Sequence, residues 1–384
     1  MICRALQLKR RKTKVRYTLF IILMITVLSL IINCDSTYPP EPEPTFNSFQ
    51  EEVQYIIESS FTFGGVSVGV IKGSEEFSIF HGTKSKNTDE PPDENTVYEM
   101  GSITKTFTAT LLADAVVNGT VRLDDEVRDY LPAGSVTMPT YYGAQISFWH
   151  LATHTSGLPR NFSDDYPLPE GVSPDDPFNL ITEENIYDYL TNYVILIRAP
   201  GSQFEYSNFG YGFLGFILSR INITTYELLL KMTLLDVLNM DRTSIHLTEE
   251  QMSNSAVGYD QWMNEVEPWG SNHVLVGCGS LKSTLKDMMS YLRANLGLLD
   301  TPLNPAITLA LQPQFADYVC LSWFLETLPD GQIITWHGGA AAGHINFIGF
   351  NRSTSTGVVI LYNWTASLLT REIGMRILEI AGRY

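Results

Sequence analysis

The stretch Glu99-Met-Gly-Ser-Ile-Thr-Lys-Thr-Phe107 sets a serine and a lysine three residues apart where a helix is expected to begin. Apolar residues follow with helical spacing at Ile103, Phe107, Leu111, Leu112 and Ala115. A serine hydroxyl needs a base within hydrogen-bond reach to act in acyl transfer. Because residues i and i+3 share one face of a helix, the pair Ser102 and Lys105 predicts a nucleophile and its base.

Two observations bear on this interpretation. Serine is a common helix N-cap, but a lysine in the first turn lies at the unfavourable end of the helix dipole, so capping alone does not explain the pair. Ser283-Thr-Leu-Lys286 has the same spacing. We expect this second copy to be incidental, because it falls in an amphipathic helix predicted over 280–296 whose lysines can face water.

Two further motifs distinguish the first copy from the second. Tyr206-x-Asn208 occurs once, in Phe204-Glu-Tyr-Ser-Asn-Phe-Gly210, where the alternative is a loop tyrosine followed by a helix-entry asparagine. His337-Gly-Gly opens an apolar, strand-like stretch that runs through Phe350. The order Ser-x-x-Lys, Tyr-x-Asn, His-Gly-Gly resembles the serine β-lactamase and penicillin-binding protein family. The resemblance is greatest to its class C, DD-peptidase and esterase-like branch, which extends to β-lactamase-like proteins of animals.

The resemblance covers residues 61–381 and includes the landmarks 148–159, 200–206 and 276–284. It implies an α/β (α+β) fold in which amino- and carboxy-terminal strands form an antiparallel sheet, flanked by helices, with a mostly helical region inserted between them. The local patterns agree, with strand-like runs at 61–80 and 333–362 and a helical pattern at 368–381. The seam between the two regions is where we expect a pocket.

The resemblance implies a role for each residue that matches a family motif. Ser102 is expected to be the nucleophile, Lys105 to hold its proton network, Tyr206 to act as general base and proton donor, and Asn208 to orient Lys105 and substrate. The resemblance also implies that the backbone N–H groups of Ser102 and Ala340 form an oxyanion hole. Gly338 and Gly339 are expected to contact substrate. No cofactor and no metal are expected.

The third motif departs from the family's common Lys-Thr-Gly pattern, since His337 replaces lysine and Gly338 replaces threonine. This removes a fixed positive charge at neutral pH, and no equivalent of the class A acidic deacylation residue is apparent. We therefore expect a serine hydrolase acting on a small ester, amide or peptide, with β-lactam hydrolysis disfavoured. The alternatives are a non-catalytic member that binds an acyl or peptide ligand or a protein partner, and a bacterial-type cell-wall enzyme.

Two other motif matches do not fit the sequence around them. Gly65-Val-Ser-Val-Gly69 matches a nucleophile elbow, but its surroundings predict a β-hairpin rather than a strand, turn and helix. His150 and His154 stand at i and i+4, but the zincin glutamate between them is missing. Both segments are expected to be structural.

The amino terminus indicates a membrane-directed segment. Residues 1–17 carry seven lysines or arginines and no acid, which predicts a cytosolic tail, and 18–33 are mostly apolar. The fifteen residues 18–32 rise about 22 Å as a helix, short of a hydrocarbon core of about 30 Å, so both a signal anchor and a cleaved signal peptide fit, and the long basic region favours the anchor. A Pro-rich stalk over 34–48 and a catalytic domain over 49–384 complete the expected organisation.

This organisation predicts an extracellular or lumenal catalytic domain on a single-pass membrane protein, or else a secreted domain. Five Asn-x-Ser/Thr sequons agree with a secretory route; they start at Asn118, Asn161, Asn222, Asn351 and Asn363. Cys278 and Cys320 are expected either to form one disulfide or to stay as buried thiols. From Asp35 onward, 18 lysines and arginines oppose 42 acidic residues, which argues against nucleic acid as a partner. The sequence assigns no oligomeric state.

Overall fold

The computed structural model describes residues 44–162, 166–167, 170–172, 176, 178–365 and 369–384. It divides the chain into two units, Met1–Phe46 and Asn47–Tyr384, and the second holds all the elements described below. The predicted basic tail and apolar segment lie outside the described residues, as does most of the predicted stalk. Among the described residues no single helix is long and apolar enough to cross a membrane; one pair of helices bent by 79° passes only on length and composition.

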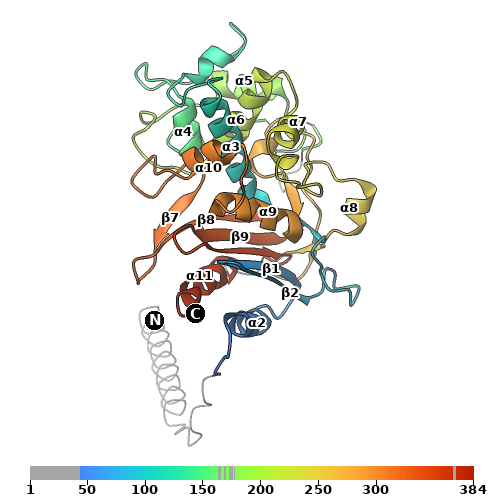
Figure 1. The fold of residues 1–384 in the computed structure, drawn as a ribbon. Coiled ribbons are helices and arrows are strands. Elements are labelled where there is room, and N and C mark those ends of the chain that lie inside the picture. The colour runs from blue at the N-terminus through green and yellow to red at the C-terminus, as the bar shows by residue number, and fades with distance from the viewer. Residues whose placement is uncertain (1–43, 163–165, 168–169, 173–175, 177, 366–368) are drawn as a thin grey trace, which may run out of the picture. The chain divides into compact units, whose positions relative to one another are not determined.

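One antiparallel sheet organises the second unit (Figure 1). Its strand order is β2-β1-β10-β9-β8-β7. The strands are β1 (Gly65–Lys72), β2 (Glu75–Gly82), β7 (Phe324–Thr327), β8 (Ile333–Ala341), β9 (His344–Asn351) and β10 (Thr356–Tyr362). The amino-terminal strand β1 pairs with the carboxy-terminal strand β10 along its length, from Val66 with Tyr362 to Lys72 with Thr356. The predicted sheet of terminal strands and the predicted hairpin β1–β2 are therefore confirmed.

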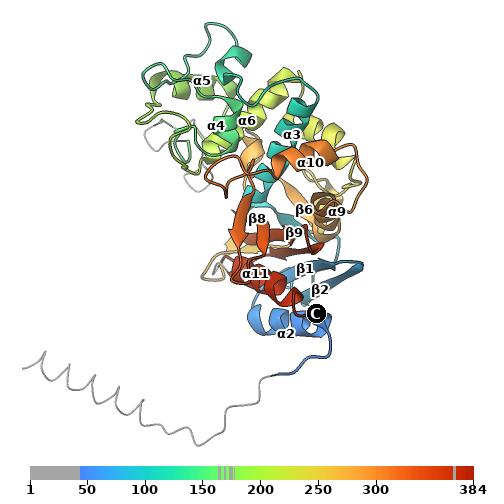
Figure 2. The same cartoon turned by 60° about the vertical axis from the view of Figure 1, so that its left-hand side comes forward.

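The sheet separates two hydrophobic cores, because successive side chains of a strand point to opposite faces. In β10, Val358 and Ile360 join one core, whereas Val359 and Leu361 join the other. This explains why β10 reads as a continuous apolar run in the sequence. The first core lies under α2 (Phe49–Ser60) and α11 (Leu369–Ala381), which cover one face of the sheet (Figures 1 and 2).

The other face carries α9 (Leu285–Leu296) and the helical region. That region extends between β2 and β7 and contains α3 (Thr104–Val117), α4 (Phe148–Ala152), α5 (Glu183–Asn192), α6 (Asn208–Ile221), α7 (Tyr226–Leu230), α8 (Glu249–Ser253) and α10 (Asn304–Ala310). A π-helical turn (Lys231–Leu235) and three 3-10 turns, η1 (Gly101–Ile103), η2 (Val127–Tyr130) and η4 (Val276–Cys278), accompany them. The predicted helical insertion is thereby confirmed.

Two small strand pairs lie outside the main sheet. β3 (Val97–Glu99) pairs with β6 (Lys282–Thr284), and β4 (Gly258–Tyr259) pairs with β5 (Glu265–Val266). The helix predicted over 280–296 therefore begins later, at Leu285, because its first residues form β6. It ends as the sequence suggests, with Gly297 at φ 80° in the left-handed region that glycine favours.

Some of the glycosylation sequons are buried in the folded unit and others are exposed. Asn351 and Asn363 are buried, and the Asn363 side chain accepts the Gly65 N–H at 2.6 Å. Asn118 and Asn222 are exposed. Cys278 and Cys320 are both buried free thiols, so the alternative of a disulfide between them is wrong in this structure.

Candidate active site

Ser102 lies in the 3-10 turn η1, directly before α3, so it is not the N-cap of that helix. The α3 N-cap is Ile103, and no side chain caps it. Lys105 lies in the first turn of α3, and its Nζ donates to the Ser102 Oγ at 3.1 Å. The predicted contact between nucleophile and lysine is present.

The Lys105 side chain is fully buried and is held from a second side. Its Nζ donates to the backbone carbonyl of Cys278 at 2.5 Å, and it lies 5.1 Å from the centroid of the Tyr206 ring. No carboxylate of the described residues forms an ion pair with Lys105. Three segments distant in sequence therefore position the ammonium next to Ser102.

Tyr206 is packed between aromatic and cationic side chains. The His154 imidazole stacks on its ring, with centroids 4.2 Å apart, and the Arg160 guanidinium lies 5.2 Å from its centroid. His154 is itself fixed, because its Nδ1 accepts the Ser207 N–H at 3.0 Å. Burial lowers the pKa of His154 well below its usual range, so this ring is neutral near pH 7.

Asn208 begins α6, immediately after the N-cap Ser207. Its amide donates to the Asn161 side chain at 2.8 Å, and its backbone N–H donates to the Arg160 carbonyl at 2.7 Å. In the part of the chain that the structure describes, no hydrogen bond joins Asn208 to Lys105. The expected orientation of Lys105 by Asn208 is therefore not seen in this geometry.

The third motif lies on β8, where the strand borders the site. β7 pairs only with Ile333–Trp336 of β8, and within the described ranges no other strand covers His337–Ala341 on that side. Backbone hydrogen-bonding groups there remain open to a ligand. Ala340, predicted to donate an oxyanion-hole N–H, lies in this open part.

Two glycines allow η1 and β8 to approach each other closely. Gly101 has φ 54°, and a Cβ there would lie 2.6 Å from the Ala340 carbonyl oxygen. A Cβ at Gly339 would lie 2.0 Å from the Met100 carbonyl oxygen. The missing side chains thus let the Ser102 segment lie against Ala340. Gly339 has this packing role, whereas its predicted contact with substrate remains a prediction, as does that of Gly338.

His337 is buried and uncharged. Its Nδ1 donates to the Gly338 carbonyl at 2.6 Å, so its Nε2 carries the lone pair. Burial and the neighbouring Lys105 charge lower the pKa of His337 to about 3. The predicted loss of a fixed positive charge at this motif is confirmed.

A cavity of about 340 Å³ opens above Ser102. Its lining includes Ser102, Asn208 and Ala340 together with Arg160, Asn161 and Asp176. Lys105, Tyr206, His337, Gly338 and Gly339 do not line it.

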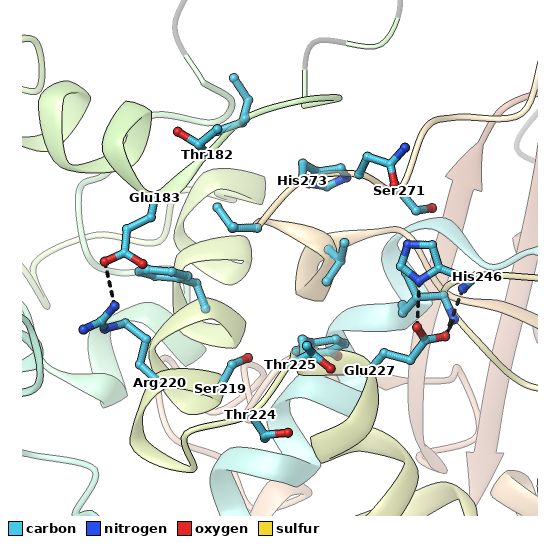
Figure 3. A pocket seen from close by; sticks show the side chains of 17 residues that line it. Thr182, Glu183, Ser219, Arg220, Thr224, Thr225, Glu227, His246, Ser271 and His273 are labelled. Atoms are coloured by element: carbon cyan, nitrogen blue, oxygen red, sulfur yellow. Dashed lines mark hydrogen bonds and ion pairs between the residues drawn. The ribbon is translucent and has the colours of Figure 1, made fainter.

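Among the described residues, three larger cavities lie away from Ser102. The first, of about 580 Å³, is drawn in Figure 3, where its charged lining residues pair with one another: Arg220 with Glu183, and His246 with Glu227. The second, of about 590 Å³, is lined partly by Glu99 and Lys282. The third, of about 600 Å³, is lined largely by α5 residues such as Glu183 and Asp188. None of the three contains a residue of the three motifs, so size alone does not identify the active site.

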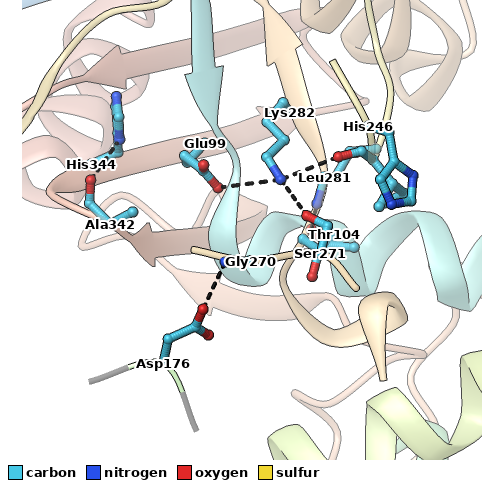
Figure 4. Close-up of polar contacts among 12 residues, drawn as sticks. Glu99, Thr104, Asp176, His246, Gly270, Ser271, Leu281, Lys282, Ala342 and His344 are labelled. Atoms are coloured by element: carbon cyan, nitrogen blue, oxygen red, sulfur yellow. Dashed lines mark hydrogen bonds and ion pairs between the residues drawn. The ribbon is translucent and has the colours of Figure 1, made fainter. Parts of the chain in front are cut away.

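Glu99 and Lys282 lie on β3 and β6, and β3 directly precedes η1, which holds Ser102 (Figure 4). They face each other across β3 and β6, with the Lys282 Nζ 4.0 Å from a Glu99 carboxylate oxygen and 2.6 Å from the Ser271 Oγ. Lys282 is buried, so the expectation that it faces water is wrong. In the second Ser-x-x-Lys copy, Ser283 is bound to Thr243 and Lys286 is exposed, which confirms that this copy is incidental.

The sequence analysis missed two residues beside Tyr206. Arg160 directly follows the landmark 148–159, and nothing in its spacing indicates that its guanidinium reaches Tyr206. For the segment that holds His150 and His154, the sequence predicts a structural role and gives no contact with Tyr206. The two histidines have different roles in the structure. His150 belongs to the α4 capping box, and His154 packs on Tyr206.

Comparison with known proteins places these features in a family. A sequence profile described as "Beta-lactamase" matches residues 54–381. A beta-lactamase of Pseudomonas fluorescens is 32% identical over 248 residues, covering 63% of each chain. The D-alanyl-D-alanine-carboxypeptidase/endopeptidase AmpH of Escherichia coli (strain K12) is 29% identical, covering 60% of this chain and 57% of that protein. The chain thus spans about six tenths of the length of these relatives.

The fold has solved counterparts. A class C beta-lactamase superposes with a TM-score of 0.74 at 24% identity, covering 87% of this chain and 98% of the other. A beta-lactamase/D-alanine carboxypeptidase from Pseudomonas syringae superposes with a TM-score of 0.72 at 24% identity, covering 86% of this chain and 97% of the other. At such identity the similarity bears on the fold alone.

Proposed function

The chain belongs to the beta-lactamase family of serine hydrolases, and on that premise we propose that it hydrolyses a small ester, amide or peptide through an acyl-enzyme on Ser102. The single observation that carries this proposal is the 3.1 Å contact between the Lys105 Nζ and the Ser102 Oγ, beside a cavity open to a small substrate. A serine nucleophile is activated by an adjacent group that takes part in moving its proton, and Lys105 occupies that position.

The proposed reaction has two stages. The Ser102 Oγ attacks the substrate carbonyl while its proton passes to the Tyr206 oxygen, the proposed general base, and the N–H groups of Ser102 and Ala340 bind the oxyanion. Collapse of the tetrahedral intermediate breaks the bond to the leaving group, which Tyr206 protonates. Water then attacks the acyl-enzyme and gives a proton to the Tyr206 oxygen, which passes it to the Ser102 Oγ as the bond to the acyl group breaks and the acid leaves.

The charge of the third motif affects which substrates the site can bind. A neutral His337 offers no charge to the carboxylate of a penicillin, so we do not place β-lactams first. The same observation, with the Asn208 amide turned to Asn161, supports a second candidate function: a member that binds an acyl or peptide ligand without turnover.

We also propose where the domain acts. The basic run over 1–17 and the apolar run over 18–33 support a single-pass anchor with the catalytic domain outside the cytosol. This proposal is independent of the chemistry. Protease protection of the full-length chain in sealed membranes would test it, and digestion of the domain from the cytosolic side would contradict it.

The hydrolase proposal is tested by labelling the purified full-length chain with a fluorophosphonate, a fluorescent penicillin and a panel of small esters, followed by intact mass measurement. We expect one adduct, lost in Ser102→Ala and retained in Ser283→Ala, the matched serine of the second Ser-x-x-Lys copy. An ester that is released as acid identifies an esterase, whereas a persistent penicillin adduct identifies penicillin-binding behaviour. Absence of any adduct on folded protein would overturn the hydrolase proposal in favour of the binding function.

A further inference from the structure

The second cavity, of about 590 Å³, has the size of a small-molecule site, which usually measures about 300–1000 Å³. Apolar side chains form much of its wall, among them Leu247, Met252, Val257 and Trp269. Met252 and Trp269 are 55% and 38% exposed, so the cavity is open to solvent beside them. Of the described lining residues, only Trp269 also lines the cavity above Ser102. The two cavities are therefore neighbours with different walls.

A buried carboxylate in the wall of the second cavity has capacity for a further hydrogen bond. Glu99 is 6% exposed, and its Oε2 accepts no hydrogen bond from a described residue. The Lys282 Nζ lies 4.0 Å from that oxygen, and it donates instead to the Ser271 Oγ at 2.6 Å and to the Ile245 carbonyl at 3.2 Å (Figure 4). Since buried polar atoms are normally hydrogen-bonded, this carboxylate calls for an additional donor.

The charges around the second cavity favour a cation as that donor. The lining holds one ammonium, that of Lys282, and three carboxylates: Glu99, Glu265 and Glu267. Lys86, outside the lining, pairs with Glu265 at 3.5 Å, whereas Glu267 forms no ion pair with a described residue. The wall therefore carries an excess of negative charge, which attracts a cation.

The two histidines of the lining do not change this balance. The His246 Nδ1 lies 2.7 Å from the Glu227 carboxylate, outside the lining, which compensates any charge on that ring. Burial lowers the pKa of His344 to about 4, so this ring is uncharged at pH 7. The second cavity is thus an apolar pocket with an acidic wall.

We propose that the second cavity binds a small organic cation, a primary ammonium group on an apolar body, at a site separate from the substrate site. The ammonium donates to the Glu99 carboxylate, which the Lys282 Nζ does not reach, and the apolar body packs on Trp269 and the side chains beside it. A hydrogen bond between an ammonium and a carboxylate is stronger than one from a neutral hydroxyl, so charge decides which ligand binds. This inference is independent of the proposed hydrolase activity, because it assigns no role to Ser102.

The test is isothermal titration calorimetry of the purified full-length chain with phenethylamine, 2-phenylethanol and 3-phenylpropanoate. These probes carry a cation, a neutral hydroxyl and an anion on the same phenyl ring. At pH 8, above the Glu99 pKa of about 7, we expect the Kd of the amine to be about ten- to a hundredfold lower than that of the alcohol. The anion should bind most weakly. Equal Kd values for amine and alcohol, tighter binding of the anion, or no binding of the amine would overturn the inference.

Two substitutions locate the amine. Glu99→Gln removes the carboxylate and should bring the amine and alcohol Kd values close together. Met252→Lys adds a cation at an exposed residue of the same lining, where a longer polar side chain can extend into solvent. It should weaken the preference for the amine by about two- to fivefold, as for an interaction between exposed charges. If Glu99→Gln does not fold, Met252→Lys still decides, and an unchanged preference there would overturn the inference.

Asn192→Lys is the matched control for Met252→Lys, since it adds the same charge at an exposed residue of the third cavity. It should leave the preference for the amine unchanged. Asp176→Asn tests the neighbouring site, because Asp176 lines the cavity above Ser102 and not the second cavity. If Asp176→Asn abolishes the preference while Met252→Lys retains it, the amine binds beside Ser102 and the inference is overturned.

Discussion

At the scale of single residues, the two adjacent glycines of the third motif have different tasks. A Cβ at Gly339 would collide with the Met100 carbonyl oxygen at 2.0 Å, whereas a Cβ at Gly338 would meet its first neighbour, the Asn346 carbonyl oxygen, at 3.7 Å. We expect Gly339→Ala to force η1 away from β8. The predicted result is a loss of about 1–3 kcal/mol in the free energy of unfolding and strongly slowed fluorophosphonate labelling of Ser102.

Gly338→Ala provides the matched comparison, since it adds the same methyl group one residue earlier, where contact is ordinary. Its free energy of unfolding, measured by urea titration, should change by less than about 1 kcal/mol. Equal effects of the two substitutions would contradict the close approach of β8 to the Ser102 segment.

The sequence predicts the contact between Ser102 and Lys105, but it does not predict the contacts around Tyr206. Ser102 and Lys105 are three residues apart on one turn, so their contact follows from local geometry. The contacts of Arg160 and His154 with Tyr206 depend on a tertiary fold that joins segments about 50 residues apart, which spacing does not reveal. The partner of Asn208 likewise depends on a loop conformation.

At the scale of elements, the short pair β3–β6 carries a buried ion pair directly before the nucleophile. Burial raises the pKa of Glu99 to about 7 and lowers the pKa of Lys282. Removing one partner leaves the other buried without compensation, so Glu99→Gln and Lys282→Met should each cost about 3–5 kcal/mol. The double variant should cost clearly less than the sum, as measured by urea unfolding in a double-mutant cycle.

The exposed pair Arg122 and Asp124 is the control for this cycle. Their side chains are 75% and 73% exposed, so solvent screens the pair and a corresponding cycle should give no resolvable coupling. Additive effects at Glu99 and Lys282 would show that the two charges do not support each other across β3 and β6.

The end of a helix that depends on neighbouring residues could be predicted from the sequence. A strand that depends on pairing with a distant segment could not. α3 ends at Val117, followed by Asn118 and by Gly119 at φ 73°, as the Asn-Gly stop indicates. The residues before Leu285 have a helical pattern but form β6, because pairing with β3 outweighs their local preference. Tertiary context also buries Lys282, which a helical wheel places toward water.

At the scale of the whole molecule, the family motifs made the architecture predictable over nearly the entire domain. The sheet closes by pairing β1 with β10, almost 300 residues apart, and no local pattern indicates that register. It followed instead from the resemblance, which supplied the long-range order. What neither pattern nor resemblance supplied is the charge state of the interior, which depends on how deeply each group is buried.

That charge state predicts sensitivity to acid. Burial lowers the pKa of four histidines: His273 and His344 to about 4, His337 to about 3, and His154 well below its usual range. In the unfolded chain histidine has a pKa of about 6.5. Between about pH 6.5 and 4 the unfolded chain therefore binds more protons than the folded one, and stability falls as the pH falls, by up to about 1.4 kcal/mol per pH unit for each histidine.

Glu99 opposes this trend, because its folded pKa of about 7 lies above its unfolded value and the folded state gains protons as the pH falls. Four histidines outweigh one carboxyl, so the net loss between pH 7 and pH 5 should be on the order of 5 kcal/mol. Urea unfolding at pH 7, 6 and 5 measures it. Glu99→Gln removes the opposing group and should steepen the slope, whereas His344→Gln should make it shallower. A flat profile would mean that water reaches these imidazoles in the folded state, which would contradict the dry interior around the site.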